Sequence, residues 1–350
     1  MQPPRLTDRQ PIILDVDTGI DDSLALLYAC ASPEAELVAV TCVAGNIDLH
    51  NVQRNTRAVL ELAGRAGVEV ALGADRPLVR PLTVASETHG PRGLGYAELP
   101  SPSRAPSQRS AAQVIAEEAR RRPQAITLVA AGPLTNVALA LRLEPALPTM
   151  LRRLVIMGGA YRSPGNTAPT TEWNAQWDPE ATKIVFDAFG APEVQSTREG
   201  AGLPARPLAL GLDVTERAKL TPAHLAALAA RAGDDALAPR TPVVRFLADA
   251  LRFYMEFHSR YDGFHGAFIH DPLALAAALD PSLVRSEAHT VDVELSGALT
   301  AGETVTDWRR TWGKPPNLDI AVEADAAAFL ARFIERVGDL AAGLAGAGQP

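Results

Sequence analysis

The chain has 350 residues, of which 47% are hydrophobic and 21% are charged, which is ordinary usage for a globular protein. Its net charge of −8, without any Lys/Arg-rich block, argues against nucleic acid as the main partner. The sequence has neither an apolar run long enough to cross a bilayer nor a signal-peptide core at its start, so we expect a cytoplasmic protein with no membrane partner.

Apolar strands alternate with helices through the first two thirds of the chain. Mainly apolar segments predict buried strands at residues 12–16, 37–43, 68–72, 125–130, 154–157 and 208–212. The segments between them predict helices at residues 22–31, 51–63 and 111–122. This alternation predicts an α/β fold with an open, mostly parallel sheet flanked by helices. Cys30 and Cys42 lie in these apolar segments and are expected to be buried thiols.

The last third of the chain is mostly helical at first. Residues 222–259 predict helices, and an apolar stripe at three-to-four spacing, which includes Tyr254 and His258, is expected to pack in the core. Residues 324–344 predict a closing helix. Alternating polar and apolar residues between these helices predict a small peripheral antiparallel element, with segments at residues 290–295, 303–308 and 317–322.

Nothing in the sequence marks a linker that would divide the chain. We therefore expect a single domain over residues 1–350, with flexible ends at 1–10 and 345–350. An insertion at residues 192–206, which contains Pro, Arg and Gly, is expected to be exposed.

Four carboxylates crowd the turn that follows the first strand. Asp15 and Asp17 lie two apart, so their side chains leave the same face of the strand, and Asp21 and Asp22 open the next helix. Carboxylates this close would repel one another unless a cation neutralised them. Oxygen ligands without a nearby Cys or His suit Ca²⁺ or Mg²⁺. The alternative is a strand end followed by an Asp N-cap on a solvated turn.

Other strands also end in turns rich in Gly or polar groups. Asn46 follows the second strand, residues 131–136 follow the fourth, and residues 158–160 follow the fifth. In open parallel sheets ligands bind outside the carboxyl ends of the strands, so these turns predict one site at that edge.

Two long loops carry further polar candidates. Residues 73–107 contain His89, which is expected either to reach a ligand from a lid or to be an exposed loop histidine. Residues 161–177 contain three groups suited to hydrogen bonds with hydroxyls, or else to ordinary loop polarity: Asn166, Glu172 and Asn174.

A third loop, at residues 261–269, holds several aromatic residues and leads to His270 and Asp271. Asp271 precedes a proline, so it either belongs to the site or caps a helix, and His270 either joins it or has no role.

Residues 14–18, Leu-Asp-Val-Asp-Thr, resemble the start of haloacid-dehalogenase-type phosphatases. That resemblance would make Asp15 a phosphoryl-accepting nucleophile and Asp17 a general acid, with Mg²⁺ as the cofactor. The family also needs a distant lysine and a second acidic motif. Neither has a convincing counterpart here, because the chain has only three lysines and none follows a Gly-ended strand.

A larger set of motifs resembles the nucleoside hydrolases, the inosine-uridine-preferring nucleoside N-ribohydrolase family. Asp-x-Asp-x-Gly-x-Asp-Asp at residues 15–22 is similar to the signature of that family. Further matching blocks follow in the family's order, at residues 43–46, 73–78, 89–95, 132–136, 157–159, 165–174, 178–181, 211–215 and 270–272. The resemblance spans roughly residues 11–310 and implies the family's Rossmann-like α/β fold.

The resemblance also implies a Ca²⁺ site. Asp17, Asp22 and Asp271 would bind the metal through their side chains, and Ala131 would bind it through its backbone carbonyl oxygen. The family often has Thr at this last position, but a carbonyl ligand tolerates Ala. Asp15 would support the metal cluster from behind.

The implied reaction is Ca²⁺-dependent hydrolysis of a ribonucleoside to ribose and a free purine or pyrimidine base. A metal-activated water, deprotonated by Asp17 and oriented on the side of Asn46, would attack C1′ through an oxocarbenium-like transition state. His270 would be the acid that assists the leaving base. The remaining substrate-binding positions would be Asp21, Asn166, Glu172, Asn174, Met157 and His89.

The resemblance further implies a homodimer or homotetramer. The base preference stays open, because it depends on loops that could include Tyr261 or His265. A non-catalytic protein that binds ribose or Ca²⁺ is another alternative, but it would need a lesion in the acidic set, and that set is intact.

Overall fold

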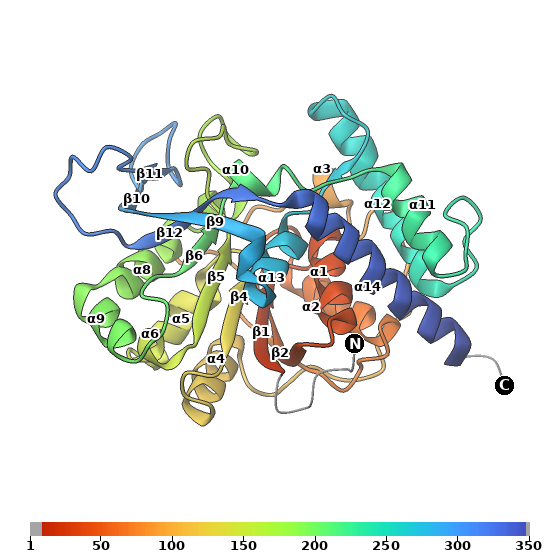
Figure 1. Ribbon diagram of the computed structural model, residues 1–350, viewed down its shortest axis with the longest axis horizontal. Helices are drawn as coiled ribbons and strands as arrows, with labels where there is room; N and C mark the ends of the chain where they lie inside the picture. The colour runs from red at the N-terminus through yellow and green to blue at the C-terminus, as the bar shows by residue number, and fades with distance from the viewer. Residues whose placement is uncertain (1–8, 348–350) are drawn as a thin grey trace.

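The computed structural model describes residues 9–347, and within that range eight strands form one sheet in the order β3-β2-β1-β4-β5-β6-β12-β9. All neighbouring pairs are parallel except β12 and β9. The fold is therefore the predicted α/β fold with a mostly parallel sheet (Figure 1). Its strands are β1 (Gln10–Val16), β2 (Ala35–Cys42), β3 (Glu69–Leu72), β4 (Thr127–Ala130), β5 (Arg153–Met157), β6 (Leu208–Leu210), β9 (Val284–His289) and β12 (Leu318–Ala324).

Helices cover both faces of this sheet. The first seven are α1 (Ile20–Ala31), α2 (Leu49–Leu62), α3 (Ser86–His89), α4 (Ala111–Arg121), α5 (Thr135–Leu143), α6 (Leu147–Met150) and α7 (Trp173–Trp177). The next seven are α8 (Pro179–Gly190), α9 (Pro192–Gly200), α10 (Leu212–Thr215), α11 (Pro222–Arg231), α12 (Pro242–Tyr261), α13 (His270–Leu279) and α14 (Ala326–Ala347). A 3-10 turn at Pro281–Leu283 follows α13.

Two hydrophobic cores lie on opposite faces of the sheet, because successive side chains of a strand point to opposite sides. Leu14 and Val16 of β1 belong to the core under α1, α13 and α14, whereas Ile13 belongs to the core under α4, α5 and α8. Figure 1 shows α4, α5 and α8 grouped on one side, away from α1, α2 and α14. Burial on both faces explains why the middle of β1, residues 11–14, is apolar without alternation.

The direction of strand addition reverses between β1 and β4. From β1 the chain adds β2 and β3 on one side, and then β4, β5 and β6 on the other. Such a reversal leaves a crevice at the carboxyl ends of the two central strands, where ligands bind in folds of this kind.

One predicted strand has a different place. The sequence predicts residues 317–322 in a peripheral antiparallel element, but this prediction is wrong, because they form β12 inside the main sheet and pair in parallel with β6. The polar residue that produced the alternating pattern, Asp319, accepts a hydrogen bond from Arg206 at 2.8 Å. The other two segments do form a separate antiparallel pair, β10 (Val291–Val293) with β11 (Thr304–Thr306). A second small pair joins β7 (Lys219–Leu220) to β8 (Ala267–Phe268).

The segment at residues 192–206 is not wholly exposed. Its first part is α9, and the buried Arg198 side chain donates to the backbone carbonyl oxygens of Pro148, Leu151, Arg152 and Pro204. Burial lowers the pKa of Arg198 to about 10. A polar composition suggested exposure, but one arginine that satisfies four carbonyl groups fixes the segment to the fold.

The chain ends differ in part from their predicted bounds. Gln10 already begins β1, and α14 continues to Ala347, three residues beyond the predicted end of the closing helix. The rest of the predicted flexible ends, residues 1–8 and 348–350, lies outside the described residues. The expectation of a single domain stays a prediction. Cys30 and Cys42 are buried free thiols, as predicted, and burial raises the pKa of each to about 12. No described helix is both long enough and apolar enough to span a bilayer.

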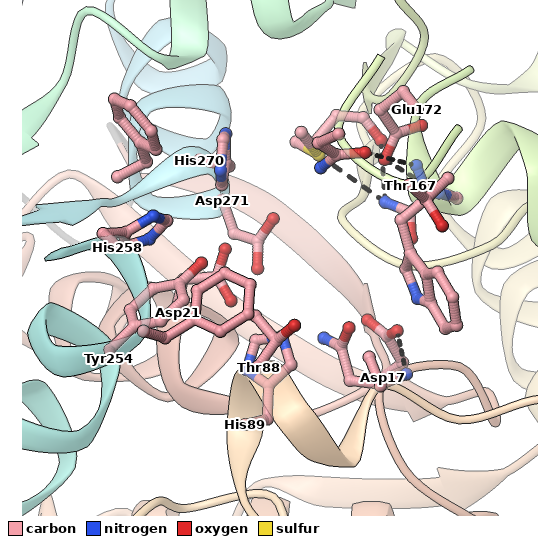
Figure 2. Close-up of a pocket in the computed structure, with 18 of the residues that line it drawn as sticks. Asp17, Asp21, Thr88, His89, Thr167, Glu172, Tyr254, His258, His270 and Asp271 are labelled. Carbon is pink, nitrogen blue, oxygen red and sulfur yellow. Dashed lines mark hydrogen bonds between the residues drawn. The ribbon is translucent and has the colours of Figure 1, made fainter. Parts of the chain in front are cut away.

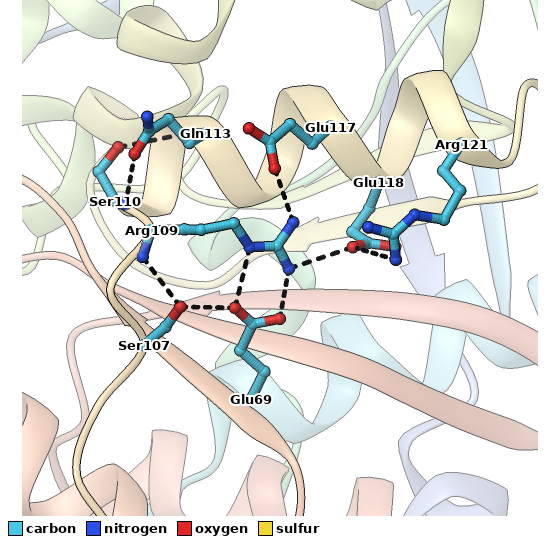
Figure 3. Close-up of polar contacts among 8 residues, drawn as sticks. All are labelled: Glu69, Ser107, Arg109, Ser110, Gln113, Glu117, Glu118 and Arg121. Carbon is cyan, nitrogen blue, oxygen red and sulfur yellow. Dashed lines mark hydrogen bonds and ion pairs between the residues drawn. The ribbon is translucent and has the colours of Figure 1, made fainter.

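A cluster of charges holds the far end of the long loop at residues 73–107. We call it the Arg109 cluster, and it consists of Glu69, Arg109, Glu117, Glu118 and Arg121 (Figure 3). Arg109 contacts Glu69 of β3 and reaches Glu117 at 2.8 Å and Glu118 at 3.2 Å on α4. Arg121 also pairs with the buried Glu118, at 3.0 Å. Hydrogen bonds from Arg109 lower the pKa of Glu69.

Candidate active site

A cavity of about 400 Å³ opens at the carboxyl ends of the central strands. Asp17 follows β1, Asn46 follows β2, Ala131 follows β4 and Met157 ends β5, and all four line this cavity. The cavity therefore lies where the strand order reverses. Figure 2 shows Asp21 and Asp271 in its interior, with Glu172 and Thr167 on one side and Tyr254, His258 and His270 on the other.

Three buried carboxylates meet beside this cavity, and Asp21 and Asp271 line it. Asp21 and Asp22 lie in the first turn of α1, Asp271 lies in the first turn of α13, and each offers an oxygen within 4.8 Å of the other two. The two helices pack together, so the positive ends of both dipoles face the same carboxylates. Burial raises the pKa of Asp21 and Asp271, and the neighbouring carboxylates raise both further.

Asp22 is held in place by donors from the turn around it. Its two oxygens accept the backbone N–H groups of Asp17 at 3.1 Å and Gly19 at 2.8 Å, and the side-chain amide of Asn46 at 3.1 Å. Asp17 lines the same cavity and accepts the backbone N–H of Asn46 at 2.7 Å. Asn46 thus bridges two of the predicted metal ligands.

The donor set suits a divalent cation. None of the described residues that line the cavity is a lysine or an arginine, so no side-chain cation of the chain offsets the buried carboxylates there. Carboxylate, carbonyl and amide oxygens are the ligands that Ca²⁺ and Mg²⁺ prefer. The group in closest mutual contact contains Asp21, Asp22 and Asp271. The assignment of Asp17, Asp22, Asp271 and Ala131 as ligands stays a prediction.

Asp15 does not line the cavity. Its Oδ1 accepts hydrogen bonds from the Thr41 hydroxyl at 2.6 Å and from the side-chain amide of Asn136 at 2.8 Å. Burial raises the pKa of Asp15 to about 7. Asn136 also donates to the Cys42 carbonyl oxygen at 3.0 Å, so it links β1, β2 and α5 behind the cavity. The sequence signal for Asn136 was its place in the turn after β4, but it received no role there.

The loop at residues 161–177 contains a short helix that orients its polar groups. Glu172 caps α7, and its carboxylate accepts backbone N–H groups of Asn174 at 2.8 Å, Ala175 at 3.0 Å and Gly159 at 2.9 Å. The side-chain amide of Asn174 donates to the Ala131 carbonyl oxygen at 2.7 Å and to the Met157 carbonyl oxygen at 3.2 Å.

Asn166 completes this side of the cavity, and it accepts the backbone N–H of Trp173 at 3.0 Å. The structure therefore brings the predicted amide and carboxylate groups together around one cavity, where they present several hydrogen-bonding atoms to a polyhydroxylated ligand.

His89 is buried at the end of α3 and is not an exposed loop residue. Its Nδ1 accepts the backbone N–H of Ile20, the first residue of α1, at 3.1 Å. A backbone N–H can only donate, so the neutral His89 ring carries its proton on Nε2. Burial lowers the pKa of His89 to about 3 and keeps the ring neutral.

His270 is the first residue of α13, and Ile269 takes the N-cap position. The alternative that Asp271 caps this helix is therefore wrong, because the helix begins one residue earlier and Asp271 points into the cavity (Figure 2). The Nδ1 of His270 lies 2.8 Å from the Thr215 hydroxyl. Burial lowers the pKa of His270 to about 3, so this ring is also neutral.

Sequence reasoning missed the contribution of α12. The apolar stripe of this helix packs in the core as predicted, but its last two turns place Tyr254, His258 and Tyr261 on the cavity wall. Two polar aromatic residues near the end of an otherwise apolar stripe were the available signal. His265 is not among the residues that line the cavity, and its Nδ1 lies 2.9 Å from the Ser259 hydroxyl.

Comparison with known proteins gives a consistent result. A family model described as "Inosine-uridine preferring nucleoside hydrolase" matches residues 12–331. The pyrimidine-specific ribonucleoside hydrolase RihA of Salmonella gallinarum is 38% identical over 328 residues, which cover 93% of this chain and 98% of the relative. RihA of an Enterobacter species is 39% identical, with 93% and 97% covered. The solved structure of a purine-preferring ribonucleoside hydrolase from Gardnerella vaginalis has a TM-score of 0.84 and 31% identity, and the match covers 95% of this chain and 99% of that one.

Proposed function

Because the chain belongs to the inosine-uridine-preferring nucleoside hydrolase family, which makes it a glycosidase acting on the N-glycosyl bond of ribonucleosides, we propose that it works with a bound Ca²⁺ ion. The observation that carries the proposal is the group of buried carboxylates, Asp21, Asp22 and Asp271, without a lysine or arginine among the described residues that line the cavity. A bound Ca²⁺ would offset their charge and lower the pKa of a water molecule beside it.

The metal would be held by Asp17, Asp22, Asp271 and the carbonyl oxygen of Ala131. Asp17 then takes the proton of the attacking water, and Asn46, which contacts both Asp17 and Asp22, fixes the position of these carboxylates. Asp15, hydrogen-bonded to Thr41 and Asn136 behind the cavity, steadies the end of β1.

The ribose lies on the side of Glu172, Asn166 and Asn174. Their oxygens and amides hold the hydroxyl groups, together with Asp21, and the carboxylates stabilise the positive charge that develops near C1′ as the bond breaks. Glu172 already accepts three backbone N–H groups, so its orientation is set before the substrate binds.

The leaving base needs a hydrogen bond as the glycosidic bond breaks. His89 offers the proton on its Nε2, because its Nδ1 accepts the Ile20 N–H. His270 offers one in the same way in the tautomer whose proton lies on Nε2, in which the Thr215 hydroxyl donates to Nδ1 instead of to the Gly211 carbonyl oxygen. Both rings are neutral, so they act by donating a hydrogen bond and not by supplying a positive charge.

Two alternatives from the sequence lose support. In the phosphatase reading Asp15 is the nucleophile, but Asp15 does not line the cavity, and the family match covers most of the chain. A non-catalytic binding protein would need a lesion in the acidic set, whereas Asp17, Asp21 and Asp271 all line the cavity.

An assay of ribose release tests the proposal. We expect the Ca²⁺-loaded protein to release reducing sugar from ribonucleosides, and we propose uridine and cytidine among its substrates, because the curated relatives quoted above are named pyrimidine-specific. The panel includes inosine, guanosine and adenosine, since the solved relative is named purine-preferring. Release from none of them would overturn the catalytic proposal. Full activity after treatment with a chelator would overturn the metal proposal. Assembly into a homodimer or homotetramer stays a prediction.

A further inference from the structure

One buried histidine in the cavity has no place in the mechanism above. His258 lies in the last turns of α12 and lines the cavity, and it is only 4% exposed. Its Nδ1 lies 2.7 Å from a carboxylate oxygen of Asp262, the residue that follows α12. Its Nε2 is buried and has no hydrogen-bond partner among the described residues. Leaving a buried polar atom unpaired is costly, so an unpaired nitrogen on a residue that lines a cavity indicates a missing ligand group.

The contact with Asp262 fixes the role of the free nitrogen. A carboxylate can only accept a hydrogen bond, so the proton of the neutral ring lies on Nδ1. Nε2 then carries a lone pair and acts as an acceptor. Burial lowers the pKa of His258, although Asp262 partly opposes this shift. The lowered pKa keeps the ring neutral near pH 7.

The surroundings of His258 match a planar ring and not a sugar. Tyr254 lies 4.5 Å and Phe268 lies 4.8 Å from it, measured between ring centroids, and both line the cavity. Figure 2 shows His258 with Tyr254 and His270 on the side of the cavity opposite Glu172. Aromatic walls favour stacking with a base, whereas the carboxylates and amides on the other side suit the ribose.

We propose that His258, positioned by Asp262, accepts a hydrogen bond from an N–H group of the nucleoside base. The N–H group is either a ring N–H, as in uracil, or an exocyclic amino group, as in cytosine. This inference rests on the proposed function. In it, His258 touches the substrate, and Asp262 is a positioning residue that acts through His258.

Two of the buried histidines that line the cavity present opposite hydrogen-bonding groups. His89 presents a donor, because its Nδ1 is occupied by the Ile20 N–H. His258 presents an acceptor, because its Nδ1–H is occupied by Asp262. A base with both a carbonyl oxygen and an N–H group on its edge satisfies both, so the pair recognises the pattern of donors and acceptors on the base.

Substrate analogues with the N–H group removed test the proposal. We measure kcat/KM of the Ca²⁺-loaded protein for uridine against 3-methyluridine and for cytidine against N4,N4-dimethylcytidine. In the natural protein we expect a preference of roughly tenfold or more for the unmethylated nucleoside in at least one pair, from the lost hydrogen bond. His258→Phe keeps the aromatic packing but removes the acceptor, and we expect it to reduce that preference to about twofold.

Three controls separate this proposal from others. His265→Phe changes an exposed histidine of the same region outside the cavity, and the preference should persist. Asp262→Asn, whose amide oxygen can still accept from Nδ1–H, should keep more of the preference than Asp262→Ala. An activated aryl riboside, whose leaving group has no N–H, should lose a smaller part of its hydrolysis rate in His258→Phe than uridine or cytidine does.

The outcomes are distinct. An unchanged preference in His258→Phe, in both pairs, overturns the recognition role of His258. An equal loss on methylated and unmethylated substrates also overturns it and assigns His258 to packing. Failure of the natural protein on every nucleoside and on the aryl riboside instead overturns the proposed function on which the inference rests.

Discussion

Two clusters of three carboxylates in this molecule have opposite surroundings. In the Arg109 cluster, Glu69, Glu117 and Glu118 surround one arginine, and a second arginine reaches the buried Glu118. In the cavity, Asp21, Asp22 and Asp271 are all buried, and no lysine or arginine lines that cavity among the described residues. The pKa of Glu69 is lowered by hydrogen bonds from Arg109, whereas the pKa of Asp21 and of Asp271 is raised by burial and mutual repulsion.

The difference separates a structural role from a functional one. The Arg109 cluster is electrostatically complete and joins β3 to α4 without help from outside the chain (Figure 3). The carboxylates at the cavity have no lysine or arginine beside them among the described residues that line it, and the proposed Ca²⁺ would offset their charge. Counting acidic residues in the sequence would not distinguish them; the position of the arginines does.

The largest expected effect comes from removing one cavity carboxylate. Asp271→Asn leaves the shape of the site but removes a predicted ligand, and we expect kcat/KM for the best nucleoside to fall on the order of a thousandfold. The matched change in the other cluster is Glu117→Gln, which should leave kcat/KM unaltered because Arg109 retains two further carboxylates. Equal kinetic effects of the two variants would contradict the division of roles.

Metal removal should destabilise the molecule through one cluster alone. A ligand present at a hundredfold its Kd stabilises the folded state by about 2.7 kcal/mol, so Ca²⁺ added after chelation should raise Tm and restore activity. We expect Asp271→Asn to lose the response of Tm to Ca²⁺, while Glu117→Gln retains it. Thermal unfolding with and without Ca²⁺ measures this, and a Ca²⁺ response that survives in Asp271→Asn would place the ion elsewhere.

Breaking the Arg109 cluster should affect stability and spare catalysis. Arg109→Met removes the main partner of three glutamates and leaves the buried Glu118 with Arg121 alone, at a cost of about 1–3 kcal/mol after allowance for solvent screening. Chemical denaturation gives the free energy of unfolding. Arg76→Met breaks an exposed pair with Asp75 and should leave the unfolding midpoint unchanged. If both variants have the same free energy of unfolding, the Arg109 cluster contributes no more to stability than an exposed ion pair.

The smallest expected effect is on the pH dependence of stability, and it comes from the buried histidines. If protonated, these side chains could offset the negative charge of the cavity carboxylates. The pKa of His89 is about 3 in the folded protein against an ordinary value of 6.5. Below pH 6.5 the unfolded chain binds this proton while the folded protein does not, so stability should fall as the pH falls from 6.5 toward 3.

The change is at most about 1.4 kcal/mol for each pH unit. His89→Asn keeps an acceptor for the Ile20 N–H but cannot bind the proton, so its free energy of unfolding should depend less on pH between 7 and 5. Denaturant titrations of the Ca²⁺-loaded protein measure the slope. Identical slopes would mean that His89 is protonated in the folded state and could itself offset the carboxylates.

The parallel sheet could be predicted from the sequence because β1, β2, β4 and β5 are mostly buried on both faces and are mainly apolar. The same reasoning failed for β12. The polar Asp319 gives this segment the alternating pattern of a half-exposed strand, but its carboxylate is paired with Arg206. It also failed for α9, because the four carbonyl partners of Arg198 are created only when the chain folds.

In the site, too, single residues could be predicted from the sequence, but their contacts could not. The acidic residues near the start of the chain were visible locally, and the family resemblance supplied Asp271. The proximity of Asp21, Asp22 and Asp271, however, depends on the packing of α1 against α13, which no local pattern encodes. His258 was assigned to packing because its spacing on α12 matches the core stripe. Only its unpaired Nε2 in three dimensions distinguishes it.

The contact between α1 and α13 has a consequence for the synthesis of the protein. Asp21 and Asp22 are translated long before Asp271. A nascent chain that stops before α13 presents two of the three grouped carboxylates and lacks the third. Because the proposed metal site includes Asp271, an interrupted translation product that lacks α13 should bind little Ca²⁺ and release no base.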